Sequence, residues 1–142
     1  LETMKIRMDA AALNAEKVAL YLSLHPKVEK VYYLGFTEKN NPDQYHILKD
    51  QCLGNGAMVS FDIKGDEKEA FIILNNLKHI KMAVSLGGTE CLAEHPYTMT
   101  HADVPDEEKL RLGVTEKMIR LSVGIENSND IIWDLGQALD MI

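Results

Sequence analysis

The sequence predicts an α+β fold, a two-layer domain in which helices cover one face of a small, mainly antiparallel sheet. Segments 57–63 and 119–125 alternate apolar and polar residues, as strands do when only one face is buried. Segments with the 3.6-residue period of amphipathic helices flank them, most clearly residues 3–24 and the stretch after residue 127. The chain has 142 residues, 46% hydrophobic and 26% charged, which suits a single domain spanning 1–142.

Residues 3–24 predict the first helix, because apolar side chains recur on one face at gaps of four, three and four. These side chains are Ala11, Ala15, Val18 and Leu22. The helix is expected to end at His25-Pro26, since a residue before proline avoids the helical region. Residues 28–34 are rich in β-branched and aromatic side chains and predict a strand.

The middle of the chain predicts a loop, a short helix, a strand and a second longer helix. Residues 35–43 lack periodicity and include an Asn-Asn-Pro stretch, which indicates a loop, and a short helix is expected near 43–51. The alternating segment 57–63 predicts a strand. Asp66 then begins a helix, because its carboxylate can cap the first turn, where Glu69 also meets the positive helix end.

In the last third of the chain, segments with a clear helix or strand pattern are separated by segments without one. Residues 81–85 predict a short strand that ends at a Gly-Gly pair, and residues 89–104 show no period. Residues 105–112 predict a short helix with an acidic start, stopped by Gly113. In the predicted strand 119–125, aliphatic residues occupy one face, and the other carries Arg120, Ser122 and Gly124. A final helix is expected from Asn127 or Ser128.

The overall charge argues against nucleic acid as a partner. The formal net charge is −7, and the fifteen Lys and Arg residues are scattered rather than clustered. No apolar run approaches the length needed to cross a bilayer, and no signal peptide is expected from the polar N-terminus. We therefore expect neither a nucleic acid nor a membrane as a partner.

Cysteine usage predicts a cytoplasmic location. Cys52 and Cys91 form no CxxC pair, and two cysteines are too few for a disulfide framework, so idle thiols in a reducing compartment are expected. The chain begins at Leu1 rather than Met, from which we expect a processed product, a fragment or a cut form of a longer protein.

Few residue patterns in the sequence indicate chemistry. Cys91, His95 and His101 lie close together, but a structural zinc site uses four ligands and usually a CxxC pair, so no metal site is expected. No GxGxxG, P-loop or GxSxG motif occurs. The pair Gly87-Gly88 after a strand is only a weak indication of phosphate binding.

Arg120 is the most informative single residue. It lies on the polar face of a strand whose other face is aliphatic, and its neighbours on that face, Ser122 and Gly124, are small. A guanidinium with small neighbours has room for a planar anion, and its fork matches a carboxylate through two parallel hydrogen bonds. The alternative, which this pattern leaves open, is an exposed strand arginine with no function.

Several motifs together resemble one enzyme family. The stretch 83–102, AVSLGGTECLAEHPYTMTHA, closely resembles a signature of the cystathionine γ-synthase family. This is the Cys/Met-metabolism group of pyridoxal-phosphate enzymes, which includes methionine γ-lyase, cystathionine β- and γ-lyases and O-acylhomoserine sulfhydrylases. Segments 105–113 and 119–126 downstream, and 25–33 and 56–61 upstream, resemble the same family at matching spacing.

The resemblance implies a role for three residues in binding the substrate. The arginine of the family's IRLSVG-like strand binds the α-carboxylate, and Arg120 stands at that position. Ser85 matches the serine that lines the same pocket, and Thr100 matches the threonine of the MTH motif near the site. A clamped carboxylate would fix the bond broken at Cα relative to the cofactor, which serves as the electron sink.

The resemblance also implies what the chain lacks. The family's Schiff-base lysine and its other cofactor-binding residues lie in an earlier, larger domain, and nothing here resembles that lysine's motif. The chain is thus expected to be the C-terminal domain of a fold-type I pyridoxal-phosphate enzyme, with the N-terminal cofactor-binding domain absent. It would hold no catalytic or cofactor-binding residue and would be inactive alone. The full-length enzyme would bind pyridoxal 5'-phosphate and form a homotetramer.

The residue at position 84 indicates which substrate the enzyme prefers. The cystathionine subgroups typically carry a glutamate just before the pocket serine, whereas methionine γ-lyase-like members carry a valine, as here. The resemblance therefore implies γ-elimination of methionine or homocysteine. Cystathionine γ-lyase or γ-synthase and O-acylhomoserine sulfhydrylase are alternatives, and Val84 could instead pack inward as an ordinary strand residue. A hypothesis of another class is a stand-alone binding domain without catalytic function.

Overall fold

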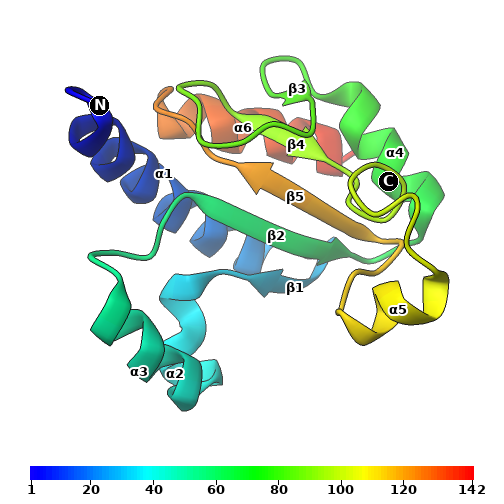
Figure 1. Ribbon diagram of the computed structural model, residues 1–142. Coiled ribbons are helices and arrows are strands. Elements are labelled where there is room, and N and C mark those ends of the chain that lie inside the picture. Colours follow the sequence, from blue (N-terminus) through cyan, green and yellow to red (C-terminus); the bar gives the residue numbers. More distant parts are fainter.

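The structure, a computed structural model, describes all 142 residues and confirms the α+β prediction. Six α-helices and a five-stranded sheet form two layers (Figure 1). In chain order, the elements are α1 (Met4–Leu24), β1 (Val28–Tyr32), α2 (Thr37–Asn40), α3 (Pro42–Gln51), β2 (Met58–Ile63), α4 (Glu67–Asn76), β3 (Lys81–Met82), β4 (Leu92–Glu94), α5 (Asp106–Arg111), β5 (Met118–Ser122) and α6 (Ser128–Leu139). No helix is both long and apolar enough to cross a membrane.

The sheet places β5 at its centre. The strand order is β1-β2-β5-β4-β3, and every neighbouring pair is antiparallel except β3 and β4. Arg120, in the middle of β5, lies opposite Ser60 of β2 on one side and Glu94 of β4 on the other. Residues from three strands therefore meet at Arg120, although they are far apart in the sequence.

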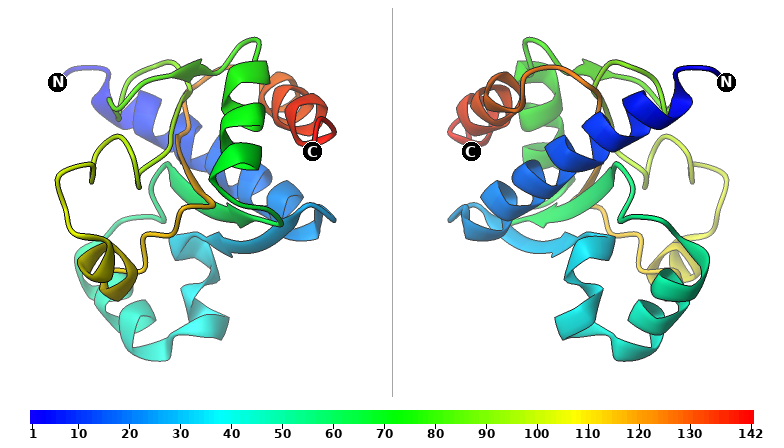
Figure 2. Two further views of the ribbon diagram at one scale, coloured as in Figure 1. Left: turned by 90° about the vertical axis from the view of Figure 1, so that its right-hand side faces the viewer. Right: turned by 90° about the vertical axis from the view of Figure 1, so that its left-hand side faces the viewer.

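Helices α1, α4 and α6 pack on one face of the sheet, as Figure 2 shows from two sides. The aliphatic and aromatic residues of β2 and β5 face them, and Phe61, Ile119 and Leu121 are almost completely buried. No long helix covers the opposite face, on which Arg120 lies (Figure 1). One-sided burial explains the alternation in the sequence, because the buried face must be apolar and the other need not be.

Short-range hydrogen bonds set the limits of several helices. Asp66 and Glu69 form a capping box at the start of α4, as the sequence predicts for Asp66. Gly113 adopts a positive φ of 77° just after α5, a conformation that glycine tolerates without strain. Asp134 of α6 accepts hydrogen bonds from the backbone N–H groups of residues 78–80 and so fixes the turn before β3.

The structure corrects three sequence-based expectations. Residues 35–43, expected to be a loop, contain α2 and a 3-10 turn. The segment 89–104 contains β4, which was not predicted because its three residues are all buried and are too few to show a period. The expected strand 119–125 ends at Ser122, and Gly124 beyond it lies against the backbone of residues 89 and 90.

Candidate functional site

The guanidinium of Arg120 is held at one nitrogen atom and is free at the other two. Its side chain is about one-fifth exposed. Its Nη2 lies 2.8 Å from Oε1 of Glu94 and donates a hydrogen bond of 3.1 Å to the carbonyl oxygen of Val84. Its Nε and Nη1 have no hydrogen-bond partner in this chain. Arg120 therefore keeps unused N–H donors on Nε and Nη1, either of which can donate to a carboxylate oxygen.

Glu94 links Arg120 to Thr100. The Glu94 side chain is only 1% exposed, and its Oε1 accepts a 3.1 Å hydrogen bond from the hydroxyl of Thr100. The Thr100 hydroxyl also lies 3.1 Å from Nδ1 of His101. The other carboxylate oxygen of Glu94, Oε2, is buried without a partner. The site is thus a row of side chains from β5, β4 and the segment after β4.

The segment 83–90 forms a loop beside Arg120. Val84 is half exposed, and Ser85 is also exposed, with no hydrogen bond from its side chain to another residue. The backbone N–H of Gly87 donates to the hydroxyl of Ser122, at the end of β5, over 3.0 Å. Gly87 has a positive φ of 73°, which the turn requires. This anchoring holds the loop next to the strand that carries Arg120.

Gly124 serves close packing rather than space around Arg120. A Cβ added at Gly124 would lie 2.4 Å from the carbonyl oxygen of Thr89, which only a shift of the backbone could relieve. The Gly124 N–H donates to Sγ of Cys91, and Cys91 donates to the carboxylate of Glu126. Burial of Cys91, more than the nearby Glu126, raises its thiol pKa to about 12. Cys91 is therefore a packed thiol and a poor nucleophile.

His95 is completely buried and fully committed to hydrogen bonds. Its Nδ1 lies 2.8 Å from Oγ1 of Thr98, and its Nε2 lies 2.7 Å from the carbonyl oxygen of Glu116. Both ring nitrogens are thus used to hold the segment after β4. Cys91, His95 and His101 form no group that could together hold a metal ion.

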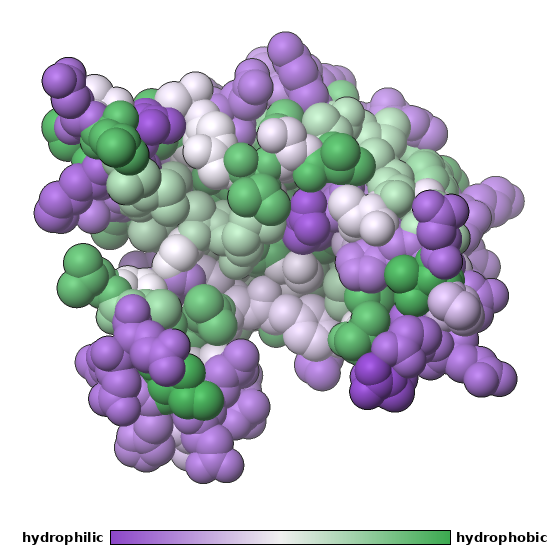
Figure 3. All heavy atoms as spheres, viewed as in Figure 1, coloured by the Kyte–Doolittle hydropathy of each residue, from purple (hydrophilic) through white to green (hydrophobic).

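The face that carries Arg120 is an open wall within this chain. Figure 3 shows that moderately hydrophobic and moderately hydrophilic residues, in pale green and pale purple, lie side by side on this face. The main surface hollows do not include Arg120, Ser85 or Thr100, and one of them reaches only as far as Ser60, opposite Arg120. A small ligand at Arg120 would need further walls from another part of the protein or from a partner.

Comparison with known proteins identifies the family. The family model of the Cys/Met metabolism PLP-dependent enzymes matches residues 1–140. The chain belongs to this family. It is 46% identical over 142 residues to L-methionine gamma-lyase of Fusobacterium nucleatum subsp. polymorphum, covering 100% of this chain and 35% of that protein. It is 47% identical over 139 residues to cystathionine gamma-lyase of Rattus norvegicus, and this match covers 98% of this chain and 34% of that protein.

A solved structure of the same kind confirms the fold. A putative O-acetylhomoserine (thiol)-lyase (metY) of Campylobacter jejuni, solved with a pyridoxyl-lysine-monophosphate, superposes with a TM-score of 0.88 at 34% identity. The match covers 98% of this chain and 32% of that one. The chain thus spans about a third of the length of these relatives and corresponds to their C-terminal part. The resemblance drawn from the motifs is confirmed.

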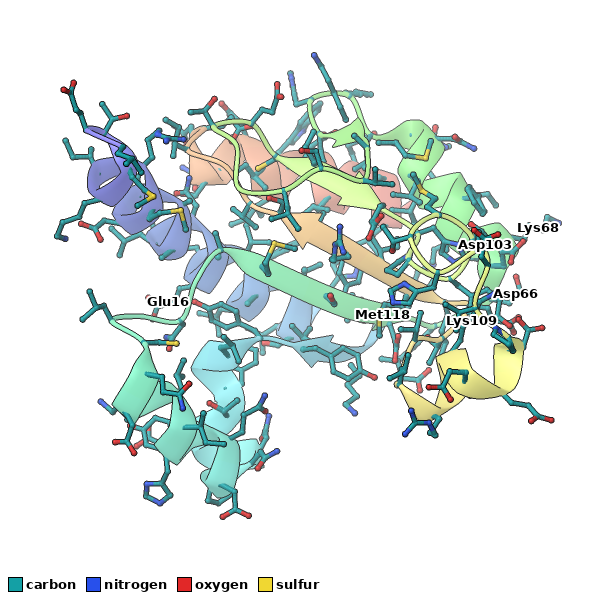
Figure 4. All side chains as sticks on the ribbon, in the orientation of Figure 1. Glu16, Asp66, Lys68, Asp103, Lys109 and Met118 are labelled. Carbon is teal, nitrogen blue, oxygen red and sulfur yellow. The ribbon has the colours of Figure 1, made fainter.

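The lysines of the chain do not fit the cofactor of the family. Lys109 is the one buried lysine, and it is paired with Asp106 at 3.1 Å and stacked over the Tyr97 ring. Figure 4 shows Lys109 on α5 and Lys68 pointing away from α4 at the edge of the molecule. The other lysines are exposed or partly exposed. A lysine that attaches pyridoxal phosphate must line a cofactor pocket, whereas Lys30, Lys49 and Lys117 line surface hollows of this chain.

The structure brings three of the predicted site residues together. Arg120 contacts the backbone of Val84 and, through Glu94, is linked to Thr100. Ser85 follows Val84 in the chain but makes no side-chain contact with Arg120. Glu94 is the residue that sequence reasoning missed. It lies within the quoted signature, but a glutamate between Ala93 and His95 carries no signal of burial in the sequence.

Proposed function

We propose that residues 1–142 form the C-terminal domain of a pyridoxal-phosphate-dependent lyase or transferase of sulfur amino acids, most like methionine γ-lyase. In this proposal, the domain binds the substrate's α-carboxylate and the cofactor-binding domain lies elsewhere in the full-length protein. The observation that carries the proposal is the unpaired donor edge of Arg120 on the helix-free face of the sheet. Membership of the Cys/Met metabolism family supports it.

The geometry around Arg120 suits an amino-acid carboxylate. Nε or Nη1 can donate a charge-assisted hydrogen bond to one of its oxygens, while Nη2 stays on Glu94 and on the Val84 carbonyl. The exposed hydroxyl of Ser85, in the adjacent loop, can add a second donor. A carboxylate held in this way fixes the orientation of Cα, which accelerates a reaction at that carbon. The cofactor, when bound in the full-length protein, would supply the electron sink.

Val84 favours an uncharged side chain in the substrate. It is half exposed, so it does not pack into the core of this chain, and it contacts Arg120 through its carbonyl. Because a valine offers no counter-charge to a distal ammonium group, we propose methionine or homocysteine over cystathionine. The similarity to cystathionine gamma-lyases keeps cystathionine as the second candidate substrate, and an O-acylhomoserine is a third.

The proposal extends to the full-length protein. We propose that it binds pyridoxal phosphate through a lysine outside this chain, acts in the cytoplasm and assembles as a homotetramer. Its partner is then an amino-acid substrate, since the negative net charge and scattered basic residues disfavour nucleic acid.

The test is a variant of Arg120 in the full-length protein loaded with the cofactor. Arg120→Ala should lower kcat/KM for methionine by at least about a hundredfold, because charge-assisted hydrogen bonds to the substrate are lost. Arg111→Ala is the control, since Arg111 is an exposed arginine paired with Glu108 on α5. Unchanged kinetics in Arg120→Ala, or an equal loss in both variants, would contradict the proposal.

A further inference from the structure

Glu94 is an unusual buried carboxylate. It lies on β4 with its side chain 1% exposed, and one of its two carboxylate oxygens, Oε2, has no hydrogen-bond partner. A buried polar atom without a partner costs about 1–3 kcal/mol, so such atoms are rare and call for a reason. The reason is not the stability of the fold, because an apolar residue at this position would avoid that cost.

Two other buried carboxylates show the contrast. Asp134 accepts hydrogen bonds at both oxygens, from three backbone N–H groups and from Gln137. Asp62, on the same sheet face as Glu94, also uses both oxygens, one for the Tyr32 hydroxyl and one for the Thr115 hydroxyl. The hydrogen bonds of Asp134 and Asp62 thus use every carboxylate oxygen to hold neighbouring segments of the fold. Glu94 instead directs its one engaged oxygen to Arg120 and Thr100.

The contacts of Glu94 determine which N–H donors of Arg120 remain free. Oε1 of Glu94 and the Val84 carbonyl both engage the same nitrogen, Nη2. The Thr100 hydroxyl donates to Oε1 and so fixes the carboxylate from the other side. A guanidinium is planar and rigid, so an anchor at one nitrogen sets the direction of the whole fork. Without this anchor, the long Arg120 side chain would sample several rotamers.

We infer that Glu94, itself oriented by Thr100, is a positioning residue that directs the free N–H donors of Arg120 toward the substrate carboxylate. This inference rests on the proposed function of Arg120 and deepens it. The ion pair with Glu94 also offsets the charge of Arg120 when no carboxylate is bound. The role requires an oxygen acceptor at Oε1 and does not require a second negative charge at the site.

The experiment compares Glu94→Ala and Glu94→Gln in the full-length protein loaded with its cofactor. The binding probe is norleucine, an α-amino acid without a γ leaving group, and its Kd is measured by calorimetry. Glu94→Ala should raise the Kd at least about tenfold and should raise KM for methionine more than it lowers kcat. Glu94→Gln keeps an acceptor oxygen for Arg120 and Thr100 and should stay within about threefold of wild type.

The matched control is Asp62→Ala. It removes a second buried carboxylate from the same face of the sheet, one that contacts Tyr32 and Thr115 and makes no ion pair with Arg120. Asp62→Ala should lower the Tm and leave the Kd for norleucine within about twofold. A purely structural role for Glu94 would make the two alanine variants behave alike, which would overturn the inference.

The outcomes separate this inference from the proposed function. If Arg120→Ala weakens norleucine binding and Glu94→Ala does not, the role of Glu94 is wrong and that of Arg120 stands. If Arg120→Ala binds norleucine like wild type, the proposed function itself is wrong. If Glu94→Ala does not fold, Thr100→Val decides, because it removes the hydroxyl that holds Oε1. Its Kd should rise beyond the threefold range allowed for Glu94→Gln, and a Kd within that range would overturn the inference.

Discussion

Removal of the Asp134 carboxylate should strongly destabilise the chain. Asp134 is completely buried on α6, and its oxygens accept 2.8 Å hydrogen bonds from the backbone N–H groups of Lys78, His79 and Ile80. Burial opposes ionisation, but the three hydrogen bonds outweigh it, so the Asp134 pKa is lowered below its ordinary value. The carboxylate therefore holds together α6 and the turn that leads to β3.

The magnitude follows from the groups left without a partner. In Asp134→Ala, the N–H of the buried Ile80 loses its acceptor, which costs about 1–3 kcal/mol. The N–H groups of Lys78 and His79 lie nearer to water and lose about 0.5–1.5 kcal/mol each. The sum is about 2–6 kcal/mol, and its midpoint corresponds to a decrease in Tm of roughly 10–15 °C for a domain of this size. Asp134→Asn should be nearly as harmful, because its amide NH₂ would face N–H donors.

The assay is urea and thermal unfolding followed by circular dichroism, with Asp130→Ala as the control. Asp130 is an exposed acidic residue in the first turn of the same helix, so its loss should cost less than about 1 kcal/mol. Because the folded-state pKa of Asp134 is depressed, its contribution is present above the unfolded-state pKa, near about 3.9. It is lost as the pH falls through the folded-state value.

The difference between wild type and Asp134→Ala should therefore shrink as the pH falls below about 4. A free energy of unfolding within 1 kcal/mol of wild type at pH 7 would refute the reasoning.

Two further predictions concern function. Val84→Glu in the full-length protein should raise kcat/KM for cystathionine relative to that for methionine by roughly tenfold, because a carboxylate beside Ser85 can pair with the distal ammonium of cystathionine. A wild-type preference for cystathionine, or no shift in the variant, would refute this prediction. The 142-residue chain alone, with pyridoxal phosphate added, should release no α-keto acid from methionine, because its lysines are exposed or, at Lys109, paired with Asp106; measurable turnover would refute it.

Much of the fold follows from the sequence, because burial on one face of the sheet leaves a readable alternation. Segment 57–63 contains β2, segment 119–125 overlaps all of β5 except Met118, and the apolar period of residues 3–24 matches α1. Elements that span little more than one period are not readable in this way. The four residues of α2 and the three of β4 depend on tertiary contacts rather than on their own pattern.

The site shows the same division. Arg120 could be found from the sequence because it lies on the polar face of an alternating strand and matches the arginine of the family's IRLSVG-like strand. Glu94 could not, because sequence reasoning expects a glutamate to lie in water, and its burial depends on pairing with a strand 26 residues later in the chain. The close packing at Gly124 was also missed, since it depends on the carbonyl of Thr89 on another segment.

The central claim is that Arg120 recognises the α-carboxylate, and the most direct measurement compares methionine with methioninamide. The amide lacks the negative charge and one acceptor oxygen but keeps the rest of the molecule. The full-length wild-type protein should prefer methionine in kcat/KM by at least about a hundredfold, and in Arg120→Ala this preference should fall to near one. An equal preference for methionine in both proteins would contradict the claim, because the carboxylate would then be recognised by another group.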